Sequence, residues 1–257
     1  MIRIGIDLDN TIINYDLAFI NESAKLGFTK KNSFKNKTSI KNHILSLSGG
    51  QKKWEILQGK VYSSGLQKAR LNDGFLRFIH RLSSRKIKCT IVSHKTKYAH
   101  YSSEQTDIRK LALNFLKKEL NLNLNKELIN DIHFTDTLDE KVLLIKKLNF
   151  HYFIDDLLTV FKNKNFPKNT SKILFTEQKS CQININQFST FEEISGFILG
   201  DWKIEDLSSI PFIFYEINNI TGRGNSKVFK LIGQNNKKFF MKVYPFDKKH
   251  NRLFSEF

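Results

Sequence analysis

The chain has 257 residues, of which 40% are hydrophobic, so it can bury a substantial core in one large domain or two smaller ones. No segment approaches the ~18 consecutive apolar residues that a membrane span requires, and the N-terminus leads directly into an apolar run. We therefore expect neither a membrane partner nor a signal peptide.

The formal net charge of +17 raises the question whether nucleic acid is a partner. The lysines, however, are spread over the whole chain among Asn, Ile and Phe, and no aromatic–basic motif of a nucleic-acid module is visible. Cys89 and Cys181 are the only cysteines and lack the spacing of metal ligands, which is typical of a reducing compartment. We therefore expect a cytoplasmic protein without a nucleic-acid partner.

The first residues of the chain carry the strongest chemical signal. Residues 2–6 form an apolar run typical of a buried strand, and Asp7 and Asp9 follow it. Residues i and i+2 of a strand share a face, and α/β sheets bind ligands at the carboxyl ends of their strands. Two carboxylates this close repel each other unless a cation or a proton lies between them. A divalent metal, a nucleophilic carboxylate and a proton-transferring carboxylate would use this arrangement, although Asp-x-Asp also occurs in turns and surface loops.

Two later strand patterns also end in polar residues. Residues 88–92 lead into Ser93, and residues 152–154 lead into Asp155 and Asp156. Each run follows a segment with helical periodicity, and strands that alternate with helices predict βαβ units and a parallel sheet. We therefore expect these polar side chains to gather with the first two carboxylates at one edge of the sheet.

Four carboxylates in one crevice predict a Mg²⁺ site, because Mg²⁺ prefers oxygen ligands. A phosphate substrate would also need a hydroxyl and a cation for its remaining oxygens, and Ser93 and Lys141 can supply them. Lys146 and Lys147 lie near Lys141, and a lysine on an amphipathic helix is more commonly a solvated surface residue.

At these residues the chain resembles the haloacid dehalogenase (HAD) superfamily of phosphotransferases. The four motifs of that family are matched in order by Ile6-Asp7-Leu8-Asp9-Asn10-Thr11, Ile91-Val92-Ser93, Lys141 and Phe153-Ile154-Asp155-Asp156. Each motif alone is unspecific, whereas all four in this order are specific. The resemblance covers roughly residues 1–200 and implies an α/β fold with a Rossmann-like parallel sheet.

The resemblance implies a role for each matched residue. Asp7 would be the nucleophile that forms an aspartyl-phosphate. Asp9 would protonate the leaving alcohol and then activate water, and Thr11 would orient its carboxylate. Ser93 would bind the transferred phosphoryl group, and Lys141 would neutralise charge on the nucleophile and the phosphate.

The implied metal site consists of Asp155, Asp156, Asp7 and the main-chain carbonyl of Asp9. Side chains of adjacent strand residues face opposite ways, so we expect only one of Asp155 and Asp156 to be a direct ligand unless the chain turns there. We favour Asp155.

Residues from about 14 to 72 are too numerous for a βα loop, which normally takes roughly 2–6 residues. Helical patterns cover residues 16–26 and 52–62, and between them residues 29–41 are poor in apolar side chains and predict a mobile loop. A helical insert directly after the first strand is what the HAD family calls a C1 cap. Such a cap would close over the site and contact the leaving group.

Residues 54–62 are the first candidates in this insert for substrate contacts. Trp54, Leu57 and Val61 share one helix face, however, and such a set is more often the core of a cap. His94 and Lys95, directly after Ser93, are better placed to meet the substrate.

The segment after residue 205 has a different character. Strand patterns at residues 215–217, 227–231 and 238–244 are separated by a glycine-containing turn and a tight turn, which predicts a small antiparallel sheet. The segment resembles the start of the small lobe of aminoglycoside phosphotransferase and choline kinase-like enzymes. The resemblance implies a phosphate loop and a nucleotide-binding lysine, with Glu256 as the partner of that lysine. These nucleotide-binding residues are Gly222, Gly224, Asn225, Ser226 and Lys242.

No catalytic or metal-binding aspartate of a large lobe follows this segment, so ATP would be a partner only in a longer protein. We expect a hydrolase domain at residues 1–200 and a loosely attached tail at residues 205–257. The small sheet predicted in this tail has no large lobe to pack against, so one of its faces would leave apolar side chains exposed. The phenylalanines expected on that surface are Phe212, Phe214, Phe229, Phe239 and Phe240.

Two functions follow from these patterns. The first is a Mg²⁺-dependent phosphomonoester hydrolase that acts through an aspartyl-phosphate on a small phosphorylated metabolite, such as a sugar phosphate or a nucleotide. The alternative is a regulatory or scaffold fragment of a longer bifunctional protein, in which the tail binds nucleotide or a partner. The intact set of motif residues favours the hydrolase.

Overall fold

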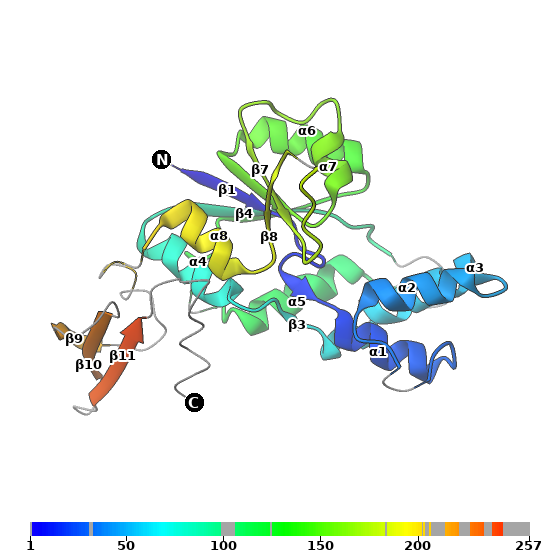
Figure 1. The fold of residues 1–257 in the computed structure, drawn as a ribbon, viewed down its shortest axis with the longest axis horizontal. Helices are drawn as coiled ribbons and strands as arrows, with labels where there is room; N and C mark the ends of the chain where they lie inside the picture. Colours follow the sequence, from blue (N-terminus) through cyan, green and yellow to red (C-terminus); the bar gives the residue numbers. More distant parts are fainter. Residues whose placement is uncertain are drawn as a thin grey trace.

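A computed structural model describes residues 2–30, 33–98, 106–123, 125–182, 184–201, 203, 206, 214–220, 227–233 and 238–243. Its centre is a six-stranded, entirely parallel sheet in the order β5-β4-β1-β6-β7-β8 (Figure 1). The strands are β1 (Arg3–Ile6), β4 (Lys88–His94), β5 (Asp131–Thr135), β6 (Tyr152–Asp155), β7 (Ser171–Phe175) and β8 (Asn186–Phe188). The chain builds outward from β1 to β5 and then returns to the other side of β1, so the strand order reverses between β1 and β6. Ligands of such sheets bind at the carboxyl ends of the strands that flank this reversal.

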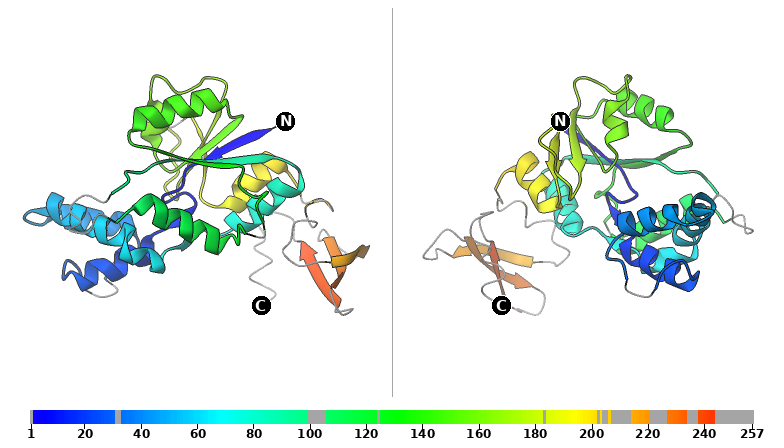
Figure 2. Two further views of the ribbon diagram at one scale, coloured as in Figure 1. Left: turned by 180° about the vertical axis from the view of Figure 1, so that it is seen from behind. Right: turned by 45° about the vertical axis from the view of Figure 1, so that its right-hand side comes forward.

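Helices cover both faces of the sheet (Figures 1 and 2). The first face carries α4 (Phe75–Ser84), α5 (Ile108–Glu119) and α8 (Phe191–Leu199), and the second carries α6 (Leu138–Leu148) and α7 (Leu158–Lys162). Ile91 and Ile154 pack into the first layer, whereas their neighbours Val92 and Phe153 pack into the second. Successive strand residues thus face opposite apolar layers, which explains why the central strands read as continuous apolar runs.

Gly5 on β1 permits close packing of the second layer. A Cβ atom at this position would lie 2.5 Å from the ring of Phe153 and 2.7 Å from the ring of Phe150. Carbon atoms pack at about 3.5–4.0 Å, so only glycine lets these rings lie against β1.

The predicted α/β fold with a parallel sheet is confirmed, and the strands expected at residues 2–6, 88–92 and 152–154 are β1, β4 and β6. The sequence patterns did not reveal β5. Its residues lie at one edge of the sheet and are mostly half-exposed, so polar and apolar side chains are mixed along it.

A helical insert lies between β2 (Ile13–Asn14) and β3 (Arg70–Leu71), which pair as a short antiparallel stem. The insert contains α1 (Asp16–Lys25), α2 (Lys37–Ser46), α3 (Gly50–Tyr62) and the 3₁₀ helix η1 (Ser64–Lys68). Its core includes the stacked rings of Phe19 and Trp54, whose centroids are 5.1 Å apart. The insert predicted at about residues 14–72 is therefore helical, as expected.

The prediction of a mobile loop over residues 29–41 is wrong in its last part, because α2 begins at Lys37. The Asn36 side chain caps this helix by accepting a hydrogen bond from the Ser39 amide, and Ile40 and Ile44 are fully buried. The buried face of α2 consists of Ile40 and Ile44, and only Ile40 lies within the predicted loop. A single apolar residue shows no helical periodicity, so the sequence of the loop did not indicate the start of this helix.

The C-terminal segment forms the predicted antiparallel sheet, with strands β9 (Phe214–Ile220), β10 (Lys227–Gly233) and β11 (Lys238–Val243) in the order β11-β10-β9. This sheet lies at the opposite end of the molecule from the helical insert (Figures 1 and 2). Phe240 is exposed as expected, but the expected exposure of Phe229 is wrong, because Phe229 and Leu231 share the buried face of the central strand. Phe212 and the side chains of Phe214 and Phe239 lie outside the described part of the chain.

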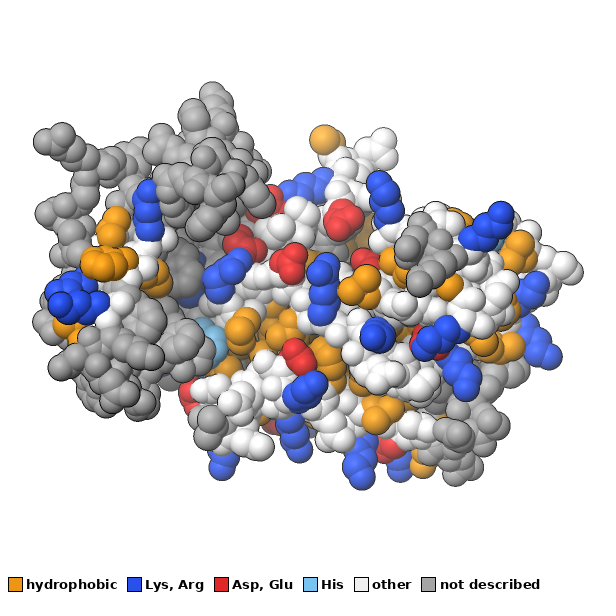
Figure 3. Space-filling model, turned by 90° about the horizontal axis from the view of Figure 1, so that it is seen from below, with side chains coloured by type: hydrophobic (Ala, Val, Ile, Leu, Met, Phe, Trp, Pro, Cys, Tyr) orange, Lys and Arg blue, Asp and Glu red, His pale blue; other side chains and the backbone are white. Residues whose placement is uncertain are grey.

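Lys and Arg side chains are dispersed among hydrophobic and acidic ones on the face shown in Figure 3. Within the described ranges, no helix has the length and apolar character needed to cross a membrane.

Asp206 ties the end of the core to α4. Its fully buried carboxylate accepts hydrogen bonds from Arg85 at 2.6 Å and from Arg81 at 3.2 Å. Arg81 also donates to Ser195 on α8 and to the carbonyl oxygen of Gly200. The sequence predicted that the first domain ends at residue 200. Because Asp206 binds Arg81 and Arg85 at the end of α4, we place the end of this domain after Asp206.

We predict that Asp206→Asn lowers the free energy of unfolding by about 3 kcal/mol at pH 7, because it leaves the buried Arg81 without its counter-ion. Burial alone would raise the pKa of Asp206, but hydrogen bonds from Arg85 and the charges of both arginines outweigh burial and lower it. This stabilisation is therefore present above the ordinary Asp pKa of about 3.9 and is lost as the pH falls through the lower folded pKa.

Urea unfolding of the wild type and the variant between pH 3 and 7 measures this effect, with Asp201→Asn, an exposed carboxylate, as the control. A difference that is absent at pH 7, or that grows as the pH falls, would contradict the prediction.

We also predict that a chain ending at residue 206 melts close to the temperature of the 257-residue chain. A chain ending at residue 201 should melt several degrees lower, because it lacks Asp206. Thermal melting of both truncations tests the proposed boundary. If both truncations unfold the core equally, the small sheet belongs to the first domain.

Candidate active site

Asp7 and Asp155 lie side by side at the carboxyl ends of β1 and β6, where the strand order reverses. The Asp7 amide donates a 2.9 Å hydrogen bond to the carbonyl oxygen of Ile154, so the β1–β6 pairing continues into the site. Both residues are buried, at 5% and 0% exposure. The sheet topology therefore brings together two carboxylates that are far apart in the sequence.

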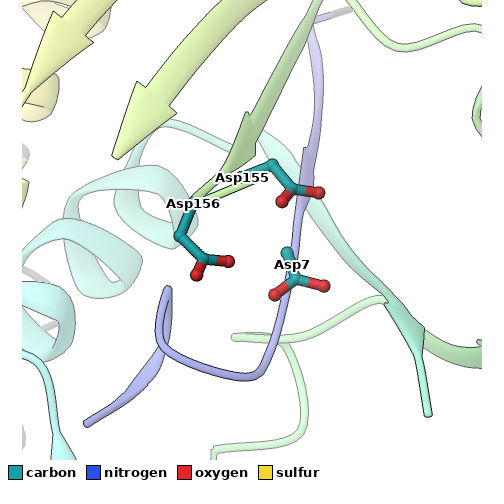
Figure 4. Close-up of side chains that lie close together, drawn as sticks. All are labelled: Asp7, Asp155 and Asp156. Carbon is teal, nitrogen blue, oxygen red and sulfur yellow. The ribbon is translucent and has the colours of Figure 1, made fainter. Parts of the chain in front are cut away.

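Asp156 joins these two carboxylates (Figure 4). Oxygen atoms of Asp7, Asp155 and Asp156 all lie within 4.8 Å of one another. The β6 strand ends at Asp155, and the Asp155 side chain accepts a 2.9 Å hydrogen bond from the Leu157 amide. The chain thus turns directly after the strand, and this turn lets two adjacent side chains face the same point.

Lys141, the first-turn lysine of α6, is buried between two of these carboxylates. Its Nζ atom donates to Asp7 Oδ1 at 2.5 Å and to Asp155 Oδ2 at 2.6 Å. Burial disfavours the ammonium form, but the two carboxylates outweigh it and raise the pKa of Lys141. Lys146 and Lys147 are exposed, so Lys141 is the lysine of this helix that reaches the site.

One buried lysine does not balance three carboxylates. Burial, together with the charges of Asp155 and Asp156, raises the pKa of Asp7 well above its usual range, although Lys141 opposes the shift. Burial and the neighbouring Asp155 raise the pKa of Asp156 to about 7. A divalent cation with a preference for oxygen ligands would relieve this repulsion, so the donor set of this site fits Mg²⁺.

The Asp9 side chain lies apart from this cluster and binds two other residues. It accepts hydrogen bonds from the Tyr15 hydroxyl at 2.6 Å and from Lys95 Nζ at 2.8 and 3.1 Å. Burial would raise the pKa of Asp9, but the charge and hydrogen bonds of Lys95 and the Tyr15 hydroxyl outweigh it and lower the pKa. Tyr15 was not among the residues predicted for the site, and the expected contact of Lys95 with the substrate stays a prediction.

Two buried hydroxyl groups at the site have no hydrogen-bond partner among the described residues. They are Ser93 Oγ on β4 and Thr11 Oγ1 in the loop after β1. Thr11 was expected to orient Asp9, but Tyr15 and Lys95 hold that carboxylate instead, because they reach it from the insert and from the segment after β4. A buried hydroxyl without a partner costs about 1–3 kcal/mol, so Ser93 and Thr11 are suited to bind a ligand that brings acceptors.

The helical insert contributes polar side chains to the same region. Lys37 Nζ of α2 donates to Asn10 Oδ1 at 3.1 Å and lies beside the Tyr62 side chain of α3. The Tyr62 ring packs edge-on against Tyr15 at 5.1 Å and lies 4.4 Å from Lys95 Nζ. The insert therefore adds Lys37, Tyr62 and Tyr15 to a site whose carboxylates come from the core.

The remaining candidates for substrate contact lie in two different surroundings. Trp54, Leu57 and Val61 are buried in the insert, so the alternative that they form its core is correct. His94 is exposed, and its Nε2 atom lies 3.0 Å from the carbonyl oxygen of Asp136.

The nucleotide site expected in the tail stays a prediction. Residues 222–226, including Gly222, Gly224, Asn225 and Ser226, lie outside the described part of the chain, as does Glu256. Lys242 lies on β11 opposite Val228 of β10, and its side chain is exposed.

No protein-family model matches the chain, and a comparison with curated proteins found no match. Several solved structures are similar to it. A HAD-superfamily hydrolase from Ehrlichia chaffeensis is 20% identical, with 76% of this chain and 94% of that chain covered and a TM-score of 0.46. A HAD-superfamily hydrolase of subfamily IA from Geobacter sulfurreducens is 9% identical, with 77% and 100% covered and a TM-score of 0.46. A predicted phosphatase from Clostridium acetobutylicum is 14% identical, with 77% and 98% covered and a TM-score of 0.47. Because these identities and TM-scores are low, we infer function from the site itself.

We predict that Asp155→Ala and Asp156→Ala each weaken Mg²⁺ binding by roughly tenfold or more, because each removes a carboxylate from the cluster. Asp155→Ala should have the larger effect, because it also removes a partner of Lys141. Calorimetric titration of Mg²⁺ into each variant measures this loss without relying on activity. Asp73→Ala, an exposed carboxylate after β3, is the control. Unchanged Mg²⁺ affinity in both variants would place the metal elsewhere.

Proposed function

We propose that this protein is a Mg²⁺-dependent phosphomonoester hydrolase that acts on a small phosphorylated metabolite through an aspartyl-phosphate. The observation that carries the proposal is the position of Lys141, held between Asp7 and Asp155 at the ends of two adjacent parallel strands. A scaffold would gain nothing from a buried lysine and three crowded carboxylates, because burying charges opposes folding. This arrangement is suited to stabilising charge that arrives with a ligand.

In the proposed reaction, a carboxylate oxygen of Asp7 attacks the phosphorus atom and the bond from phosphorus to the ester oxygen breaks. Asp9 gives a proton to the leaving alcohol. Water then attacks the phosphorus of the acyl-phosphate, Asp9 accepts the proton of this water, and inorganic phosphate leaves with Asp7 restored. The Ser93 hydroxyl donates a hydrogen bond to the phosphoryl group, and Lys141 offsets the charge on Asp7 and the phosphate.

Mg²⁺, when bound, would be held by Asp7, Asp155, Asp156 and the main-chain carbonyl of Asp9 and would supply charge neutralisation at the phosphoryl group. Asp9 must take up a proton before it can protonate the leaving alcohol. Asp9 is ionised beside Lys95 at neutral pH, and a phosphate dianion arriving nearby raises the pKa of Asp9 by repulsion. The carboxylate then takes up a proton from solvent, while the Lys95 ammonium, 2.8 Å away, holds it in position.

We predict that Asp7→Asn lowers hydrolysis of p-nitrophenyl phosphate in the presence of Mg²⁺ by at least about 10³-fold. The amide cannot form an acyl-phosphate, but it fits the same space, so circular dichroism should show an intact fold. Acid quenching of the wild type during turnover of a ³²P-labelled ester should trap label on the protein, whereas the variant should trap none. Substantial turnover by a well-folded Asp7→Asn variant would remove Asp7 as the nucleophile.

A further inference from the structure

The lysines of the site differ in their counter-ions. Lys141 has Asp7 and Asp155, and Lys95 has Asp9, all within 3 Å. Lys37 makes no ion pair within the described part of the chain, where its Nζ atom meets the neutral side chains of Asn10 and Tyr62. Its Nζ atom also lies 5.3 Å from the centre of the Phe19 ring. Lys37 is therefore a partly desolvated cation whose near contacts are dipoles and rings, and the carboxylates of Asp156 and Asp9 act on it only from a greater distance.

Lys37 is held in place by its backbone as well as by its side chain. It is the first residue of α2, and its amide donates a 2.7 Å hydrogen bond to Asp16 Oδ1 on α1. Its side chain extends from the insert to Asn10, whose backbone adopts a left-handed conformation with φ of 63° in the loop after β1. Burial would lower the pKa of Lys37, but Tyr62, Asp156 and Asp9 together raise it, so the side chain is charged.

The position of Lys37 relates it to the leaving group rather than to the transferred phosphoryl group. The phosphoryl group has Lys141 and Ser93 in the core, whereas the leaving alcohol must lie near Asp9, which protonates it. The Tyr62 ring contacts Lys95, which holds Asp9, and the Tyr62 side chain also lies beside Lys37, so Lys37 lies on the leaving-group side. A desolvated cation there is stabilised by an anion that the leaving group carries.

We infer that Lys37, together with the Tyr62 hydroxyl, binds a second anionic group on the substrate. The substrate class is then a small phosphate monoester whose alcohol carries a carboxylate or a second phosphate. This inference rests on the proposed function, because it uses Asp9 to locate the leaving group.

Binding to an inactive background tests the inference separately from turnover. In the Asp7→Asn variant with Mg²⁺, calorimetry compares 3-phosphoglycerate with glycerol 3-phosphate, which differ by a carboxylate in place of a hydroxymethyl group. A second pair, propane-1,3-diol bisphosphate and 3-hydroxypropyl phosphate, tests a second phosphate in the same way. We expect the anionic member of at least one pair to bind tenfold or more tightly, and the pair that shows this preference identifies the second anion.

Adding Lys37→Met should reduce this preference at least about tenfold, whereas Lys37→Arg should retain most of it, because arginine keeps the charge. Lys41→Met is the matched control, since Lys41 lies one turn later on α2 with an exposed side chain. A preference that is absent in both pairs, or that Lys37→Met leaves unchanged, would overturn the inference. Equal weakening of both members of a pair would also overturn it, because Lys37 would then contact the shared phosphoryl group. Absence of turnover in the wild type with the binding preference intact would instead contradict the proposed hydrolysis.

Discussion

The ammonium group of Lys141 is buried between the carboxylates of Asp7 and Asp155, and the rest of the site is arranged around this contact. Three elements meet here: α6 supplies the lysine, and the adjacent strands β1 and β6 supply the acids. Removing one partner of a buried ion pair typically costs 3–5 kcal/mol, so the contact also fixes how α6 lies on the sheet. The neighbouring Asp156 leaves the cluster with an excess of negative charge, which a divalent cation would offset.

The site has two halves with different origins. The core supplies the carboxylate cluster and the Ser93 hydroxyl, all at the carboxyl edge of the parallel sheet. The insert supplies Tyr15, Tyr62 and Lys37, which surround Asp9 and its partner Lys95. Because the stem of β2 and β3 joins the insert directly to the loop after β1, any movement of the insert would change the surroundings of Asp9 first. Asn72 strengthens this junction by donating hydrogen bonds to the carbonyl oxygens of Asn10 and Thr11.

The stability of the core depends on polar contacts as well as apolar ones. The two apolar layers on either side of the sheet bury nearly all the side chains of β1, β4 and β6. The buried Asp206 carboxylate pairs with Arg81 and Arg85 of the α4 region. These ion pairs join the segment that follows α8 to the helices on the first face of the sheet. Each nitrogen and each carboxylate oxygen of these charged groups has a hydrogen-bond partner, which is the condition under which buried charges are tolerated.

Local pattern by itself determined the central strands, most of the helices and the acids that end β1 and β6, because strand alternation and helical periodicity are properties of adjacent residues. The order of these elements also allowed a parallel sheet with its site at one edge to be predicted. Tertiary structure alone decided the pairing of Lys95 with Asp9, 86 residues apart. The pairing of Lys141 with Asp7, 134 residues apart, was expected only from the family resemblance. Tertiary structure also decided that Asp156 turns into the cluster and that Lys37 reaches Asn10 from the insert. These contacts depend on which strands are neighbours and on where the chain turns, and no periodicity within a single segment encodes either.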